Sequence, residues 1–228
     1  MKNQISHKGL DLIVSLLKNR ISGYTFTELS INDIGLRTDY SLYQVQTATE
    51  IMMRHLQMVD YTPVIQLCEL PENVAGSCNL NDDKLTYIKL DKERFCSQYY
   101  HPSQLLTIIA HELCHKFLWI HGIKETSQKV EYITDACAVY VGFGSIIMSG
   151  IEIIDNVEFT GISVITKFRT VGYLEKWQIA YLRKKFYNVR IPFKLRKKLH
   201  KILRRIVIIG CISWVCLILL AVFVAFLI

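Results

Sequence analysis

Residues 102–122 of the chain read PSQLLTIIAHELCHKFLWIHG. Their apolar content, with proline at the start and glycine at the end, predicts a largely buried helix. Within this stretch, residues 111–115 read HELCH and follow the pattern H-E-x-x-H. Side chains four residues apart lie on one helix face, so His111 and His115 can reach the same metal ion. Without such an ion, these polar residues would be unfavourable on a buried helix.

A zinc ion at this place needs a third protein ligand and keeps its fourth position for water. The first candidate is Glu131, in a second segment of helical character, with Asp135 one turn later. Asp135 would accept a hydrogen bond from the free N–H of a ligand histidine and so fix the tautomer of that imidazole. Glu112, between the two histidines, would take a proton from a water at the metal.

The second candidate is His121, six residues after His115, which gives the ligand spacing of the metzincin peptidases. In that group, the third residue after the second histidine is a glycine, which lets the chain turn back to the metal. Here that residue is Leu118. A continued helix would rotate His121 about 80° away from the face that carries His111. The sequence therefore favours Glu131 and leaves His121 as the alternative metal ligand.

H-E-x-x-H followed by E-x-x-x-D on the next helix resembles the gluzincin pattern of thermolysin-type zinc metallopeptidases. The short distance between the two motifs is similar to that in small single-domain peptidases of the ImmA/IrrE type and in the M48-like group. The resemblance covers about residues 60–150 and implies an α+β, zincin-like domain that hydrolyses peptide bonds with Zn2+. By this resemblance the zinc ligands would be His111, His115 and Glu131. Glu112 would be the general base, and Asp135 would be the hydrogen-bond partner of His111.

The chain departs from the more common form H-E-x-G-H at Cys114, where we expect a small buried thiol, the alternative being an oxidation-sensitive group. The residue that would stabilise the oxyanion is not identified by the sequence. Tyr140, His101 and Tyr173 are the candidates.

The expected domain spans residues 1–182 and is mostly helical, with a helical N-terminal part up to about residue 60. Helical periodicity appears in residues 10–19 and 42–58. Residues 62–70 and 85–90 have the composition of short strands. An extended peptide could add to the second of these strands through main-chain hydrogen bonds, or the strand could belong to a sheet without any ligand.

Residues 206–228 contain no charged side chain. As a helix they would measure about 35 Å, which is enough to cross the apolar core of a bilayer. We therefore expect a single C-terminal transmembrane helix that acts as a tail anchor. No signal peptide is apparent at the N-terminus, where Asp11 interrupts the apolar stretch.

The charge of the chain is unevenly distributed. It has 27 basic and 20 acidic residues, and eleven of the basic ones lie in residues 183–205, which contain no acidic residue. The remainder has 16 basic and 20 acidic residues, a net charge of −4. This pattern predicts a basic juxtamembrane segment that attracts anionic lipid headgroups, with the N-terminal domain on the cytoplasmic side of a bacterial inner membrane. Nucleic acid, the other partner of basic segments, is a weaker explanation beside a membrane span.

The seven cysteines include no C-x-x-C pair, and two of them lie within residues 206–228. This usage indicates reduced thiols and no disulfide framework. The sequence thus predicts a membrane-anchored zinc metallopeptidase with a peptide or protein substrate. Two alternatives stay open: a zinc-stabilised, non-catalytic binding module tethered to the membrane, and a structural membrane protein in which the motif is fortuitous.

Overall fold

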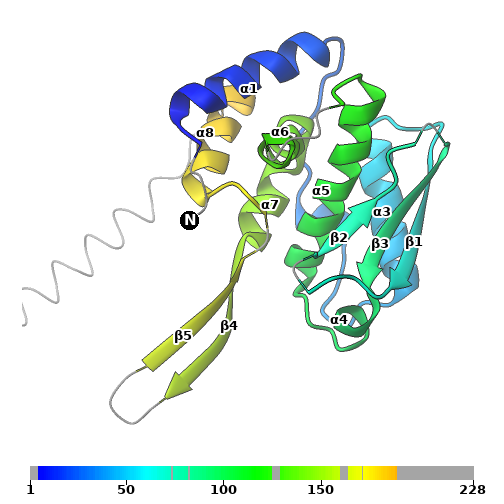
Figure 1. The fold of residues 1–228 in the computed structure, drawn as a ribbon, viewed down its shortest axis with the longest axis vertical. Coiled ribbons are helices and arrows are strands. Elements are labelled where there is room, and N and C mark those ends of the chain that lie inside the picture. The colour runs from blue at the N-terminus through cyan, green and yellow to red at the C-terminus, as the bar shows by residue number, and fades with distance from the viewer. Residues whose placement is uncertain are drawn as a thin grey trace, which may run out of the picture. The chain divides into compact units, whose positions relative to one another are not determined.

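Helix α5 (Pro102–Ile120), which carries the H-E-x-x-H motif, lies at the centre of the fold (Figure 1). The computed structural model describes residues 5–72, 74–81, 83–124, 129–159, 164–170 and 172–188. These belong to one unit, residues 1–189. The predicted membrane helix 206–228 and most of the predicted basic segment 183–205 lie outside the described residues.

The bounds of α5 follow from local chemistry. The His101 side chain accepts a hydrogen bond from the Ser103 N–H, and Pro102 occupies the first turn, where its missing N–H has no cost. The chain leaves the helix at Gly122, whose φ of +74° favours glycine. Helix α5 packs against α6 and α7 and against the sheet strands β2 and β3. It is therefore buried along most of its length, as predicted.

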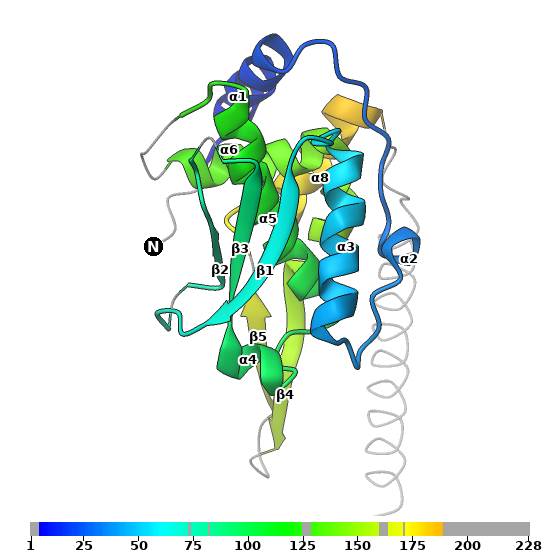
Figure 2. The same cartoon turned by 90° about the vertical axis from the view of Figure 1, so that its right-hand side faces the viewer.

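The sheet has three strands in the order β1-β3-β2, namely β1 (Thr62–Cys68), β3 (Leu85–Asp91) and β2 (Gly76–Cys78) (Figure 2). Strand β3 pairs with β1 in parallel and with β2 antiparallel. Its side chains Thr86, Ile88 and Leu90 are buried, in the alternation expected of a strand with one face on the core. Both edges of β3 are thus occupied, so the expectation that a peptide could add to residues 85–90 is wrong. Among the described residues, β2 is the edge strand that lies beside α5.

The N-terminal part is helical, as predicted, and its helices are α1 (His7–Arg20), α2 (Ile31–Ile34) and α3 (Leu42–His55). Ser6, Ser30 and Ser41 cap these helices by accepting backbone N–H groups. Helix α3 covers β1, and the short helix α4 (Lys92–Cys96) connects β3 with α5 (Figure 2). The described residues therefore form an α+β fold with a small sheet.

A continuous helical segment follows α5 and comprises α6 (Lys129–Ala138), the π-helical turn η1 (Val139–Phe143) and α7 (Gly144–Gly150). Gly142, at φ +100°, bends the segment where a side chain would collide with the Thr27 carbonyl oxygen. In the described part of the chain, residues 129–150 are one stretch long and apolar enough to cross a membrane. However, 78% of its apolar window is buried in the protein, and it packs on α5 as a core helix does. Length and composition alone are thus weak evidence for a membrane span here.

A two-stranded hairpin, β4 (Glu152–Phe159) and β5 (Val164–Thr170), extends from the body of the unit between α7 and α8 (Figure 1). Helix α8 (Lys176–Tyr187) then returns to pack against α1 and α7. Arg183, on this helix, makes a two-pronged ion pair with Glu28 at 2.6 and 2.8 Å. The folded unit thus continues beyond the predicted boundary at residue 182, because α8 includes the first basic residues of the predicted juxtamembrane segment. The described cysteines are free thiols.

Candidate metal centre

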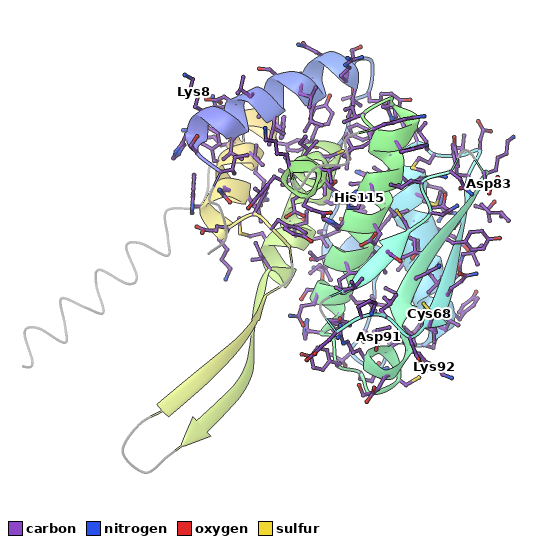
Figure 3. All side chains as sticks on the ribbon, in the orientation of Figure 1. Lys8, Cys68, Asp83, Asp91, Lys92 and His115 are labelled. Atoms are coloured by element: carbon purple, nitrogen blue, oxygen red, sulfur yellow. The ribbon has the colours of Figure 1, made fainter. Side chains whose placement is uncertain are left out.

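Three side chains from two helices converge on one point. His111 and His115 project from α5, and Glu131 projects from the first turn of α6. The Nε2 atoms of the two histidines lie 3.0 Å apart. The Glu131 Oε2 atom lies 2.9 Å from the His111 Nε2 atom and 3.4 Å from that of His115. His115 is labelled on α5 in Figure 3. This His111–His115–Glu131 group could hold a metal ion.

The spacing of these three atoms fits a small tetrahedral cation. Zinc binds nitrogen and oxygen at roughly 2.0–2.2 Å, so tetrahedral ligands lie about 3.3 Å apart. The observed separations of 2.9, 3.0 and 3.4 Å come within a few tenths of an ångström of that value. Two imidazoles and one carboxylate are also a ligand set that zinc accepts while keeping a position for water.

Each histidine is oriented through its other ring nitrogen. The Nδ1 atom of His111 lies 2.7 Å from the Asp135 Oδ1 atom, to which it donates. The Nδ1 atom of His115 lies 3.2 Å from the Thr134 hydroxyl, whose own hydrogen is donated to the Val130 carbonyl. Both rings therefore turn Nε2 toward the convergence point. Asp135 was predicted for this role, whereas Thr134 was missed, although its position beside Asp135 on the same helix was a usable signal.

The carboxylates determine the protonation of the cluster. Burial alone would lower the pKa of His111, but its hydrogen bonds to Asp135 and Glu131 outweigh burial and raise the pKa to about 10. Burial would raise the pKa of Glu131, but the hydrogen bonds from both histidines lower it to about 2. The metal-free cluster thus holds an extra proton on an imidazole beside an ionised carboxylate.

Glu112 lies beside this cluster and is only 7% exposed. Burial raises the pKa of its carboxyl group, an effect that the positive charge of the neighbouring histidines opposes. Its carboxyl group also forms a hydrogen bond with the thiol of Cys78 on β2. Strand β2 approaches α5 closely here, since a Cβ atom at Gly76 would lie 3.3 Å from the Glu112 Cγ atom and 2.7 Å from the Ile108 Cγ2 atom. A carboxylate near the metal position, with a raised pKa, can accept and return a proton.

The cluster opens into a pocket of about 860 Å³. Strand β2, residues before it and Tyr173 line this pocket together with the cluster. The ring of Tyr173 stacks on that of His111 with 5.7 Å between centroids. Its backbone N–H and that of Leu174 donate to the Asp135 Oδ2 atom at 2.6 and 2.9 Å. Asp135 therefore connects the Tyr173 backbone directly to a candidate ligand.

The other proposed oxyanion residues lie elsewhere. The Tyr140 hydroxyl donates to the Ile21 carbonyl oxygen, and His101 caps the N-terminus of α5. His121, the alternative ligand, follows the end of α5, where its ring packs against Phe117 at 4.2 Å and its Nδ1 atom bonds the Phe117 carbonyl oxygen. The cluster that could hold a metal ion does not include it in the described part of the chain. Cys114 is fully buried, as expected.

Comparison of the chain with protein-family models, with curated proteins and with solved structures finds no match.

Proposed function

We propose that this protein is a zinc-dependent peptidase with a zincin-like domain, tethered to a membrane by its C-terminal segment. The observation that carries the proposal is the convergence of His111, His115 and Glu131 beside the buried carboxyl group of Glu112, all on the wall of one pocket. A purely structural zinc site has four protein ligands, whereas this group offers three, and a metal ion held by them would keep a position for water.

The residues of the pocket support distinct roles in peptide hydrolysis. When bound, zinc would supply a Lewis acid that polarises the substrate carbonyl and makes water more acidic. Glu112 accepts the proton of the attacking water and passes it to the leaving nitrogen, a transfer that its raised pKa favours. Asp135 holds His111 in the ligating tautomer. The hydroxyl group of Tyr173 donates a hydrogen bond to the oxyanion.

Strand β2 supports a role in substrate binding. Its pairing with β3 occupies one edge, and in the described residues no strand pairs with the other. Gly76, Ser77 and Cys78 also line the pocket. An extended peptide can form main-chain hydrogen bonds with such an edge and bring its scissile bond to the metal.

The decisive experiment replaces Glu112 with Gln in the full-length protein. The amide keeps the shape of the side chain but cannot accept a proton, so we expect unchanged zinc content and a loss of at least about a hundredfold in peptide cleavage. Zinc is measured by elemental analysis and cleavage with internally quenched peptides. Glu50→Gln, on α3 and outside the pocket, is the matched control. Cleavage by the Glu112→Gln protein at the parent rate would contradict the proposal, and a parent protein that binds zinc without cleaving any peptide would favour the non-catalytic module.

The membrane part of the proposal rests on the sequence of residues 183–228. The uncharged stretch 206–228 spans the bilayer, and basic residues before it contact anionic headgroups on the cytoplasmic side. Substrates that are themselves bound to the membrane would then be concentrated near the pocket.

A further inference from the structure

The pocket continues well beyond the metal cluster. From His111 its wall follows α5 toward the N-terminus through Ile108 and Thr107, and it ends at Tyr100, Tyr99 and Arg94. Arg94 belongs to α4, which lies next to the start of α5 (Figure 1). Figure 3 labels Asp91, the N-cap of α4, at this end of the sheet, away from His115. The pocket thus has a metal end and a distal end.

The distal end contains a guanidinium group with unused donors. Arg94 donates from Nη1 to the Val74 carbonyl and the Tyr100 hydroxyl, at 3.1 and 3.3 Å, and from Nη2 to the Glu72 carbonyl. A guanidinium has five N–H groups, so the Nε–H and one Nη2–H have no acceptor among the residues that the structure describes. No carboxylate of the described residues lies within ion-pair distance of this group. The charge of Arg94 is therefore held in place by neutral acceptors.

Asp91 attracts Arg94 electrostatically, but the two side chains form no ion pair in the described part of the chain. Both oxygens of Asp91 accept backbone N–H groups, from Leu70 at 3.2 Å and from Arg94 itself at 2.8 Å. Glu72 also lines the pocket, but its side chain is exposed to solvent. Arg94 donates to the backbone carbonyl oxygen of Glu72, not to its carboxylate. Repulsion from the solvated Glu72 carboxylate is weaker than a direct contact, because water screens charges at the surface.

Aromatic rings complete this end of the pocket. Tyr100 is 6% exposed, and its hydroxyl group fixes the guanidinium plane through the bond from Nη1. Tyr99 is 43% exposed and packs edge-on against Tyr100 at 5.2 Å between centroids. A flat cation with two donors left, held rigid beside aromatic rings, matches the geometry of a carboxylate, which accepts two parallel hydrogen bonds from arginine.

We propose that Arg94, with Tyr99 and Tyr100, forms a subsite that recognises a carboxylate group of the substrate several residues away from the scissile bond. This inference rests on the proposed peptidase function. The helix rises 1.5 Å per residue, so the start of α5 lies about 14 Å from His111, which corresponds to roughly four residues of extended peptide. The carboxylate comes either from an acidic side chain or from the C-terminus of the peptide.

The test uses the full-length protein in detergent, loaded with zinc, and sets of peptides that differ at one position. A single Glu or Gln is moved along an otherwise neutral, amidated peptide, and a further set has Gln throughout with a free C-terminal carboxylate. Binding is measured by fluorescence anisotropy with the Glu112→Gln protein, and cleavage is measured with the parent. We expect about tenfold to hundredfold tighter binding when a carboxylate lies about four residues from the metal end. The set that shows the preference identifies its source.

Variants of Arg94 separate recognition from a structural role. Arg94→Gln should abolish the preference for the carboxylate, and Arg94→Lys should keep part of it because the charge remains. Arg54→Gln, an exposed arginine on α3, is the matched control and should keep the full preference. An Arg94→Gln protein that binds acidic and neutral peptides in the same ratio as the parent would overturn the subsite.

The failure of the inference can be distinguished from failure of the proposed function. Cleavage without any preference for a carboxylate overturns the subsite and leaves the peptidase intact. Absence of cleavage contradicts the peptidase, while the anisotropy ratios still decide whether the distal end recognises a carboxylate. Absence of binding to every peptide in the sets overturns the subsite.

Discussion

At the scale of single residues, Asp135 does more than orient a ligand. One of its oxygens accepts from His111 and the other accepts from the backbone of Tyr173 and Leu174. These bonds satisfy a carboxylate that is only 1% exposed, and such a group would otherwise be very unfavourable in the protein interior. The position of Tyr173 at the pocket is therefore coupled to the geometry of the candidate metal ligands.

This coupling leads to a prediction for Tyr173→Phe. The substitution keeps the ring that stacks on His111 but removes the hydroxyl group, so zinc content should not change. We expect kcat/KM for peptide cleavage to fall about a hundredfold, mainly through kcat, because the proposed hydrogen bond to the oxyanion would be made in the transition state. The control is Tyr132→Phe, because the Tyr132 ring lies 6.2 Å from the Tyr173 ring between centroids. This variant should behave like the parent. Equal losses in both variants would assign Tyr173 a packing role only.

The raised pKa of His111 leads to a prediction for metal binding. In the metal-free protein its pKa is about 10, so at neutral pH it carries a proton that a metal ion must displace. Zinc affinity should therefore increase with pH from 7 to 9, by about tenfold per pH unit if one proton is released. Competition with a chromophoric chelator measures the affinity. A flat profile over this range would show that His111 is already neutral.

The same shifts give the stability of the metal-free protein a defined pH window. His111 has a raised pKa, so its contribution is complete below its ordinary value of 6.5 and is lost as pH rises toward about 10. Glu131 has a lowered pKa, so its contribution is complete above its ordinary value of 4.5 and is lost as pH falls toward about 2. Together the two groups contribute most between about pH 4.5 and 6.5.

At the scale of elements, the contact between β2 and α5 shapes the pocket wall. Gly76 allows the strand to lie against Ile108 and Glu112, where a methyl group would come within 2.7 Å of the Ile108 Cγ2 atom. Gly76→Ala should therefore displace β2, lower the melting temperature by a few degrees and reduce cleavage about tenfold, with zinc still bound. Scanning calorimetry and peptide assays check this. Ser77→Ala, one residue along the strand, is the control, and similar effects in both variants would argue against the close approach.

The elements also show what the sequence could and could not predict. Helix α5 was predictable because Pro102, a long apolar stretch and Gly122 agree on one buried helix. The pairing of Glu131 with the histidines was predictable in outline, because both motifs follow the helical repeat. Strand β2 was not, since three residues are too few for an alternating pattern. The central position of β3 depends on that missed strand.

Long-range contacts account for the rest of what was missed. Tyr173 was one of three oxyanion candidates, but nothing local indicates that its backbone N–H donates to Asp135, 38 residues earlier in the sequence. Likewise, Lys116 is fully buried despite its charge, because its ammonium group donates to the carbonyl oxygens of Asn81 and Asp83. Those oxygens belong to a loop 35 residues away in sequence, and only the folded chain brings them to α5.

At the scale of the whole molecule, the folded unit and the C-terminal segment have opposite character. Residues 1–182 carry a net charge of −4, which disfavours electrostatic attraction of this part to anionic lipids. The proposed membrane association therefore depends on the sequence after α8. The described helical stretch Lys129–Gly150 does not supply it, because its apolar side chains are occupied in the core around α5.

This division predicts the behaviour of Leu217→Arg/Leu220→Arg, two charges near the middle of the uncharged stretch 206–228. Each arginine at the centre of a bilayer costs about 2.5–3.5 kcal/mol on insertion scales, so the double variant should move from the membrane fraction to the soluble fraction. Its zinc content should stay the same, because the metal ligands lie on α5 and α6. Leu217→Ala/Leu220→Ala is the matched control and should remain in the membrane after carbonate washing. If the arginine variant also resists carbonate, the stretch is not the membrane anchor and another part of the chain must hold the protein there.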